Sequence, residues 1–209
     1  LLTHPTGAKN EPTLWHGVRE LLAYELATGG QVSFINRLDR ETSGLLVVAK
    51  SPEMQEYMRT YWKQLVTRRA YVAVAEGIFT PKEGQIRSWF TEDRHNAMVY
   101  SSPTDDGGDL AITHYEVLKE NTETQLSLVE LNLETGRTNQ IRVHLASQGH
   151  PVVGDRKYGH GNTESPIDRL CLHARVLEFI HPATEQTVHF ETPTPKEFMH
   201  LMQKQNQSC

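Results

Sequence analysis

One carboxylate in this chain of 209 residues stands where it could act as a nucleophile. Asp39 lies between Arg37 and Arg40, in a short segment that leads into the apolar run 45–49. Apolar surroundings favour the neutral form of a carboxyl group, whereas nearby guanidinium groups favour the ionised form. An aspartate that stays charged while partly removed from water suits nucleophilic chemistry. The same charge pattern is also typical of an ordinary surface ion-pair cluster, so the pattern alone leaves both interpretations open.

Two longer motifs add a resemblance to a known family. The first is RLDRETSGLL at residues 37–46, which resembles the signature loop of the RluA family of pseudouridine synthases. The second is GRTNQIRVHL at residues 136–145, which resembles that family's other hallmark and is followed in family order by GHP at 149–151 and GDRKYG at 154–159. The resemblance covers nearly the whole chain. It implies an isomerase that converts a specific uridine of ribosomal or transfer RNA into pseudouridine.

The resemblance also implies roles for three residues. Pseudouridine synthases detach uracil from ribose C1′, turn it and rejoin it through C5, without a cofactor or a metal. Asp39 is the expected essential carboxylate, which attacks C1′ or removes the 2′ proton, and Arg142 is its expected bidentate partner. Tyr71, in a stretch similar to the family's Lys-x-Tyr strand but with Arg69 in place of lysine, is expected to pack on the base and take the C5 proton. From the residues alone, Tyr71 also suits a core aromatic and Arg142 an exposed helix arginine.

The remaining expected contacts are with RNA, because the target base must leave its stack to reach a buried aspartate. Basic and amide side chains in or beside the motifs are predicted to bind the RNA: Arg37, Arg40, Arg68, Arg69, Arg137, Asn139, Gln140, Arg156 and Lys157. The chain departs from the family at Asn36 and Asn139, where histidine is usual. Both asparagines keep a hydrogen-bonding side chain but cannot titrate near neutrality. These departures bear on the RNA target more than on the chemistry.

Composition permits an RNA-binding cleft on an acidic protein. The net charge is −5, but the acidic residues are concentrated in the middle of the chain, where residues 83–134 hold 11 Asp/Glu and 3 Lys/Arg. Residues 1–82 hold 10 Lys/Arg and 8 Asp/Glu, and residues 135–209 hold 8 Lys/Arg and 7 Asp/Glu. The two cysteines, Cys171 and Cys209, form no disulfide framework or zinc spacing, and the histidines show no metal-ligand spacing. We therefore expect no metal and no cofactor. No apolar run approaches the roughly 18 residues of a membrane span.

Cap residues and apolar spacing predict four helices. The first begins after Thr13 and ends at the glycines 29–30, and the second begins after Ser51 with a proline in its first turn. The third begins after Thr138, ends at Gly149 and presents Arg142 on a face separate from its apolar residues. The fourth opens with a capping box at residues 194–197. The predicted apolar stripes are Leu14, Val18, Leu21, Leu22 and Leu26 in the first helix, and Met54, Tyr57, Met58, Tyr61 and Leu65 in the second.

Strands are predicted at residues 45–49, 70–75, 112–118, 125–133, 170–179 and 187–191, with a loop at 101–108. The run 45–49 is typical of a strand buried on both faces. The alternation in 125–133 changes phase between Leu128 and Leu131, which predicts a bulge. Strands outnumber helices without strict alternation, so the class is α+β. The resemblance sharpens this to a mixed, largely antiparallel sheet with flanking helices and an active-site cleft.

We expect one catalytic domain over residues 1–209, acting as a monomer in the cytoplasm. In the resembled family a strand precedes the segment with which this chain begins, so we expect an N-terminal strand to be truncated or not covered. We find no S4 domain.

Two other functions stay open. A retaining glycoside hydrolase would need a second carboxylate about 5–5.5 Å from Asp39, and Glu41 is the nearest in sequence. A non-catalytic RNA-binding protein would keep the fold without the reaction.

Overall fold

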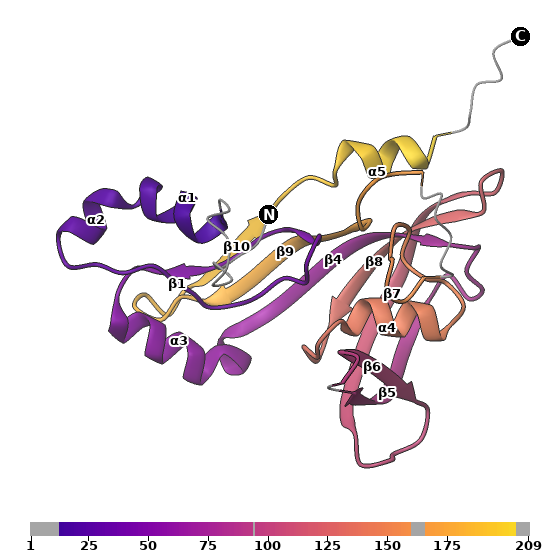
Figure 1. The fold of residues 1–209 in the computed structure, drawn as a ribbon, viewed down its shortest axis with the longest axis horizontal. Coiled ribbons are helices and arrows are strands. Elements are labelled where there is room, and N and C mark those ends of the chain that lie inside the picture. Colours follow the sequence, from indigo (N-terminus) through magenta and orange to yellow (C-terminus); the bar gives the residue numbers. More distant parts are fainter. Residues whose placement is uncertain (1–12, 94, 160–165, 204–209) are drawn as a thin grey trace, which may run out of the picture.

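A long, twisted sheet carries the elements of the fold (Figure 1). The computed structural model describes residues 13–93, 95–159 and 166–203. Seven strands of the sheet run in the order β10-β9-β4-β8-β7-β5-β6 with antiparallel neighbours, and β2 adds a parallel pairing to β9. β1 and β3 form a separate antiparallel pair. The predicted α+β class and largely antiparallel sheet are confirmed.

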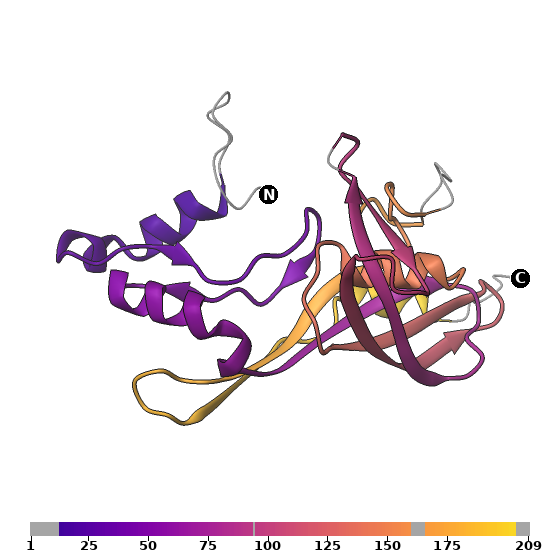
Figure 2. The ribbon, with the colours of Figure 1, turned by 90° about the horizontal axis from the view of Figure 1, so that it is seen from below.

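The elements have the following bounds: α1 Leu14–Leu21, α2 Ala23–Ala27, β1 Ser33–Phe34, β2 Ser43–Gly44, β3 Val48–Ala49, α3 Pro52–Leu65, β4 Val66–Glu76, β5 Glu83–Asp93, β6 Met98–Ser102, β7 Asp109–Asn121, β8 Leu126–Leu133, α4 Gln140–Ser147, β9 Leu172–Ile180, β10 Thr187–Glu191 and α5 Lys196–Leu201. Figure 2 shows α1–α3 at one end of the molecule and β5–β8 at the other, with β4 and β9 running between them.

Strands β4 and β8 form the centre of the core. Both are buried at successive positions rather than alternate ones, as happens when both faces of a sheet are covered. Ile141 and Leu145 of α4, Phe198 of α5 and the adjacent Met202 belong to the same apolar cluster as these strands. Burial on both faces explains the change of phase in β8 without a bulge there. The register shift lies instead on β7, between Val117 and Lys119.

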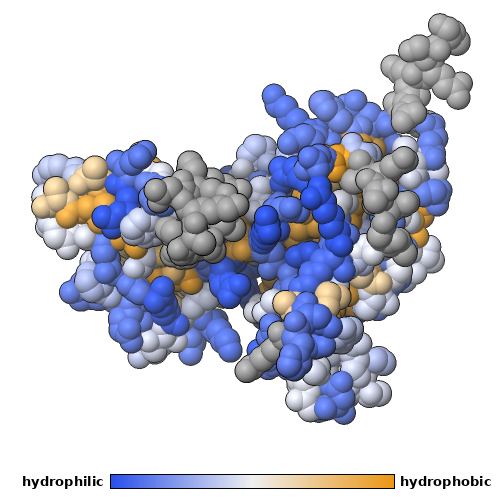
Figure 3. All heavy atoms as spheres, viewed as in Figure 1, coloured by the Kyte–Doolittle hydropathy of each residue, from blue (hydrophilic) through white to orange (hydrophobic). Residues whose placement is uncertain are grey.

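The N-terminal helices differ from the prediction in what they bury. Thr13 caps α1 as predicted and forms a capping box with His16, but the helix breaks at Leu22 and α2 follows. Neither helix contains a buried residue, and Leu21 and Tyr24 are 81% and 80% exposed. The predicted apolar stripe therefore has no core beneath it. Figure 3 shows apolar surface at this end of the molecule.

Helix α3 begins as predicted, since the Ser51 hydroxyl accepts from the backbone N–H of Met54 at 3.2 Å and Pro52 occupies the first turn. Met58 and Leu65 are buried. Tyr57 and Tyr61 are about half exposed, with their ring centroids 4.8 Å apart, so the prediction of a continuous core stripe is wrong at these two positions.

Two predicted caps do not form. Helix α4 follows Asn139, whose φ is 53°, and has no side-chain cap, so Thr138 does not cap it. The predicted stop holds, because Gly149 has φ 79° directly after the helix. Helix α5 follows Pro195 without a side-chain cap, so the predicted capping box is absent.

Two strand predictions also need correction. Only residues 48–49 of the run 45–49 form a strand, and Leu45, Leu46 and Val47 are half-buried. Strands β5 and β6 were not predicted, and the predicted loop at 101–108 begins only after Ser102. The buried side of β5 carries Ser88 between Ile86 and Phe90, and this polar position hides the alternation.

Candidate active site

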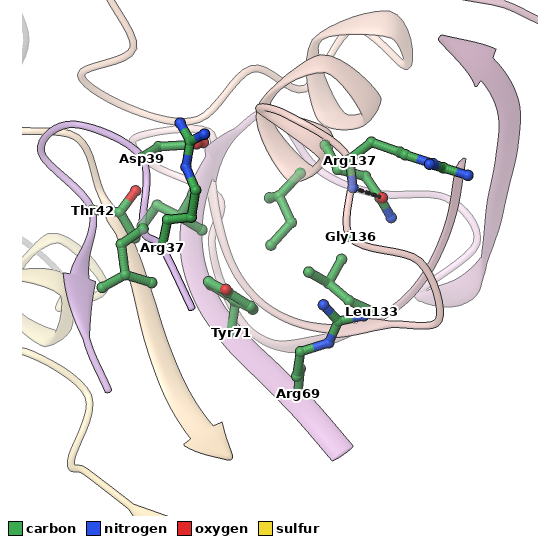
Figure 4. A pocket seen from close by; sticks show the side chains of 12 residues that line it. Arg37, Asp39, Thr42, Arg69, Tyr71, Leu133, Gly136 and Arg137 are labelled. Atoms are coloured by element: carbon green, nitrogen blue, oxygen red, sulfur yellow. Dashed lines mark hydrogen bonds between the residues drawn. The ribbon is translucent and has the colours of Figure 1, made fainter. Parts of the chain in front are cut away.

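Four segments that are distant in sequence line one pocket (Figure 4). They are the loop 37–42, strand β4, the stretch 133–141 that leads into α4, and strand β9, which contributes Leu172. The cavity measures about 110 Å³. Among the described residues that line it, Asp39 is the only carboxylate. The lining residues are Arg37, Leu38, Asp39, Thr42, Arg69, Tyr71, Leu133, Gly136, Arg137, Gln140, Ile141 and Leu172.

A tight turn presents Asp39 to this pocket. The backbone N–H of Thr42 donates to the carbonyl oxygen of Asp39 at 3.1 Å. Between them Glu41 has φ 73°, in the left-handed region that costs free energy for a non-glycine residue. Such a conformation persists only where the surrounding structure holds the backbone, and it is common at functional sites.

Strand β2 holds the end of this turn against the sheet. Ser43 and Gly44 pair in parallel with His173 and Ala174 of β9. The Ser43 hydroxyl lies 2.7 Å from His173 Nδ1 and accepts from Arg169 at 2.5 Å. Gly44 has φ 120°, and a Cβ atom there would overlap the backbone of Ala174. The position of Asp39 therefore depends on a contact that only glycine permits.

Asn36 closes the base of the same loop. Its side-chain amide donates to the carbonyl oxygen of Leu45 at 3.4 Å, and its Oδ1 accepts from the backbone N–H of Val47 at 2.8 Å. This local role needs a donor and an acceptor but no titratable ring, so asparagine serves here in place of the family's histidine.

The environment of Asp39 opposes its ionisation. Its side chain is 28% exposed. Burial raises the pKa of Asp39 above its usual value, and the negative charge of Asp155 adds to the shift. The cations of Arg142 and Arg37, together with the backbone N–H of Asn139, lower the pKa but do not cancel the effect of burial. Figure 4 shows the Arg37 guanidinium beside Asp39.

Arg142 is close to Asp39 but forms its bidentate pair with another carboxylate. Its Nε and Nη2 donate to Asp155 at 2.7 and 2.8 Å, whereas its Nη1 lies 4.0 Å from Asp39 Oδ2. The predicted ion pair with Asp39 is present, but the predicted bidentate geometry is wrong. Burial raises the pKa of Asp155, and the hydrogen bonds from Arg142 outweigh this, so its pKa is below the usual value.

The side chain of Asp155 has no exposed surface and is held from several sides. The backbone N–H groups of Lys157 and Tyr158 also donate to Asp155 Oδ1, at 2.9 and 3.0 Å. Asn139 completes the arrangement, because its Oδ1 accepts from Arg142 at 2.8 Å and its amide donates to the Tyr158 hydroxyl at 3.2 Å. Arg142 is therefore oriented by groups that do not line the pocket.

Tyr71 and Arg69 lie two positions apart on β4 and face the same side of the sheet, towards the pocket. Burial raises the pKa of Tyr71, and Asp39 raises it further, while Arg69 lowers it. The tyrosine is therefore neutral at pH 7. Arg69 lies against Gly136, with Nη1 2.5 Å from the position that a Cβ atom would take.

Several predicted RNA-binding side chains are bound within the protein. The Gln140 side chain is buried, accepts from Thr135 and from the backbone N–H of Arg137, and donates to residues 112 and 113. Asn139 is bound to Arg142 and Tyr158, as above. Arg137 lines the pocket, but its side chain points away, to Asp109 at 3.1 Å and the Leu110 carbonyl oxygen at 2.9 Å (Figure 4). These contacts hold the pocket wall in shape.

Other predicted residues lie outside the pocket. Arg68 faces the opposite side of the sheet, where it pairs with Glu130 at 3.1 Å. Arg156 pairs with Asp168, both exposed, and Lys157 donates to the Ala97 carbonyl oxygen. Arg40 is exposed beside the Asp39 turn. The structure thus brings Arg37, Asp39, Tyr71 and Arg69 together, with Arg142 adjacent.

Two residues of the site were missed by sequence reasoning. Asp155 is the bidentate partner of Arg142. It lies in the GDRKYG motif at residues 154–159, to which no function was assigned from the sequence. Thr42 lines the pocket, and its buried hydroxyl has no hydrogen-bond partner within the described part of the chain. Its signal was its place in the first motif.

No group of three or more metal-ligating side chains occurs among the described residues. Within the same residues, no helix is long and apolar enough to cross a membrane.

The chain is similar to known RNA pseudouridine synthases. Residues 1–147 match the family model described as RNA pseudouridylate synthase. The chain is 39% identical over 205 residues to the uncharacterized RNA pseudouridine synthase YhcT of Bacillus subtilis, covering 96% of this chain and 65% of that protein. It is 38% identical over 214 residues to ribosomal large subunit pseudouridine synthase D of Neisseria meningitidis, covering 97% and 55%. The chain therefore spans between about half and two thirds of the length of these relatives.

A solved structure is also similar. Human RNA pseudouridylate synthase domain containing 1 matches with a TM-score of 0.71 and 28% identity, over 84% of this chain and 73% of that one.

Proposed function

The chain belongs to the RNA pseudouridylate synthase family, as its resemblance to the RluA family predicted, and we propose that it isomerises a uridine of RNA to pseudouridine. The observation that supports this best is the placement of Asp39. It is the only carboxylate among the described pocket residues, it is partly desolvated, and it lies beside Arg142 and Arg37. Tyr71 shares the pocket and offers a flat surface for one base.

We propose that the ionised form of Asp39 is the active one. It either attacks C1′ or removes the 2′ proton, and both reactions need the carboxylate. Because Arg142 is held by Asp155, it can favour ionisation from 4.0 Å without covering the carboxylate oxygens. The N1–C1′ bond then breaks, and the uracil turns and rejoins through C5.

The role proposed for Tyr71 is mainly to pack against the base. Burial raises the pKa of Tyr71, so even less of it is ionised at pH 7 than of an ordinary tyrosine, and the neutral phenol is a poor proton acceptor. Its hydroxyl can still relay the C5 proton to a stronger base. These two contributions can be separated by substitution.

The RNA must present an unstacked base, because Asp39 lies partly buried in the pocket. Arg37 and Arg40 are exposed on the Asp39 turn and suit contacts with the flanking phosphates. We propose ribosomal RNA as the target, with transfer RNA as the second choice, since a relative at 38% identity is named for the large ribosomal subunit. Action on such RNA as a monomer in the cytoplasm, without metal or cofactor, completes the proposal.

The pocket supports a glycoside hydrolase less well. A retaining hydrolase needs a second carboxylate about 5–5.5 Å from the first. None of the other described lining residues is acidic, and Asp155 is bound to Arg142. A non-catalytic RNA-binding role is best separated from catalysis by experiment.

The test is to map pseudouridines in RNA. Total RNA from cells that lack this gene is incubated with the purified chain or with Asp39→Asn, and new pseudouridines are mapped by sequencing. We expect one or a few new sites with the wild type and none with Asp39→Asn, although circular dichroism shows both proteins folded. Full activity of folded Asp39→Asn, or no activity of the wild type on any RNA, would contradict the proposal.

A further inference from the structure

Arg69 presents its guanidinium to the pocket without a partner among the residues that the structure describes. It makes no hydrogen bond or ion pair to any residue that the structure describes, whereas Arg137 and Arg142 are each held by an acidic side chain. Burial lowers the pKa of Arg69, and the Tyr71 hydroxyl opposes that shift. A partly desolvated cation with unused donors is costly to keep, so an external acceptor is expected to complete it.

The surroundings give this cation a defined place. Gly136 makes room for it, since a Cβ atom there would lie 2.5 Å from Arg69 Nη1. Arg68, the preceding residue, faces the other side of the sheet and is already paired with Glu130. The Arg69 guanidinium therefore occupies the space that a side chain at position 136 would take, and it points to the pocket.

Tyr71 lies between Arg69 and Asp39. Its hydroxyl is influenced by both charges, while Arg69 and Asp39 do not appreciably influence each other. Figure 4 shows Asp39 and Arg69 on opposite sides of the pocket, with Tyr71 between them. A base that packs on Tyr71, with its sugar carbon at Asp39, therefore directs its far edge to Arg69.

We propose that Arg69 is a specificity-determining residue that donates to a carbonyl oxygen of the target uracil; this inference rests on the function proposed above. While uracil is joined through N1, the edge farthest from C1′ carries O4. Arginine only donates hydrogen bonds, so it suits this oxygen and opposes the amino group that cytosine has there. Arg69 would thus distinguish uracil from cytosine by the group at C4, which is an acceptor in uracil and a donor in cytosine.

The same contact survives the rotation of the base. When the N1–C1′ bond breaks, its electron pair stays on the uracil, and the negative charge spreads over both carbonyl oxygens. Rotation that brings C5 to C1′ exchanges O2 and O4, so Arg69 again meets a carbonyl oxygen. The C5–C1′ bond forms, C5 loses its proton and N1 gains one, which balances the isomerisation. Arg69 therefore also stabilises the detached anion.

The test compares uridine and cytidine at the mapped site. Two transcripts that differ only in this base are titrated with Asp39→Asn protein, which cannot turn over, and with the same protein carrying Arg69→Met, Arg69→Lys or Gly136→Ala. Gly136→Ala displaces the guanidinium without changing the charge. Arg68→Met is the matched control, because it removes the neighbouring arginine on the other face. Thermal melting checks that each protein is folded.

We expect Asp39→Asn to prefer uridine by roughly 10–150-fold, the range of one charged hydrogen bond. Arg69→Met and Gly136→Ala should bring this ratio close to one, Arg69→Lys should lower it partly, and Arg68→Met should leave it unchanged. Equal weakening of both transcripts by Arg69→Met, with a shallower salt dependence, would identify a phosphate contact and overturn the inference. An unchanged ratio would also overturn it. If the wild type forms no pseudouridine, the proposed function itself fails, and this inference with it.

Discussion

Arg142 binds Asp155 with two hydrogen bonds, of 2.7 and 2.8 Å, and leaves its third nitrogen 4.0 Å from Asp39. The cation therefore acts on Asp39 through space, and the oxygens of Asp39 are not occupied by a close pair. A bidentate partner would have lowered the pKa of Asp39 further but would have shielded the same oxygens from a substrate. The arrangement favours reactivity over ion-pair strength.

Asp155→Asn should change the pH dependence of the reaction. The substitution removes a negative charge that raises the pKa of Asp39, and it frees Arg142 to approach Asp39. Both changes favour the ionised form of Asp39, so its pKa falls. The rate, which drops as Asp39 is protonated, should then persist to lower pH than in the wild type. The rate at its plateau should fall roughly 10–100-fold, because Arg142 is misplaced.

The measurement is pseudouridine formation against pH on a transcript of the mapped site. Asp168→Asn is the control, since it removes the exposed partner of Arg156 and should leave the profile unchanged. An acid limb that moves to higher pH in Asp155→Asn would contradict the assigned position of Arg142.

Gly44→Ala should loosen the Asp39 loop. The new Cβ atom would overlap backbone atoms of Ala174, and φ 120° is unfavourable for alanine. We expect the free energy of unfolding to fall by about 2–5 kcal/mol from strain and overpacking together. The rate of pseudouridine formation should also fall, because Asp39 is no longer held in place at the pocket.

Urea unfolding of the full chain measures this loss. Gly17→Ala is the matched control, since it lies within α1 and nothing is within 4 Å of its Cβ position. It should be neutral or stabilising by up to about 1 kcal/mol. Equal stability of Gly44→Ala and the wild type would show that β2 does not anchor the loop.

The residues of the pocket were predictable where the motif is local. Asp39 was recognisable because its neighbours in sequence are also its neighbours in space. The partner of Arg142 was not, because only Asp39 was predicted, and the preference for Asp155 depends on where α4 places the guanidinium. Asn139 and Gln140 were predicted to bind RNA from their chemistry, but their partners at residues 113, 135 and 158 become visible only in the fold.

The fold was predictable to a similar degree. Ser51 and Thr13 cap their helices because capping is decided within four residues. Thr138 looks equally suitable, but the chain takes the left-handed conformation at the next residue and the helix begins later. The apolar pattern around Leu21 correctly indicated a helix, although spacing cannot say whether another element covers that face.

Tyr71→Phe should retain substantial activity if packing is the main role of the ring. Its pKa is raised, so little tyrosinate is present at pH 7, and loss of the hydroxyl removes only a relay. We expect a decrease well below the roughly 10²–10⁴-fold that follows loss of a general acid or base. Tyr71→Ala should lose RNA affinity as well, because the packing surface goes.

Single-turnover rates and RNA binding by both variants separate the roles. A full 10²–10⁴-fold loss in Tyr71→Phe, with normal RNA binding, would assign the C5 proton to the hydroxyl. Free uracil in that reaction would place the defect after detachment.

His144 should make the stability of the fold sensitive to acid. It is fully buried, with Nδ1 2.8 Å from the Thr113 hydroxyl and Nε2 3.0 Å from the Ser88 hydroxyl. Burial lowers the pKa of His144 from 6.5 to about 4. Below pH 6.5 His144 is protonated in the unfolded chain but stays neutral in the native state, so the free energy of unfolding falls until the pH reaches the native pKa. Between about pH 7 and pH 4.5 the loss should be about 2.5 kcal/mol.

His144→Gln should remove this part of the pH dependence, because glutamine keeps a polar group in the site but does not titrate. The variant should be less stable near neutral pH, by about 1–3 kcal/mol if a hydroxyl loses its partner. Its stability should then fall less steeply than that of the wild type as pH is lowered. The pKa of His173 is also lowered by burial, so it contributes in both proteins and cancels in the difference. Urea unfolding at both pH values measures this difference, and parallel losses in the two proteins would show that His144 is protonated in the native state.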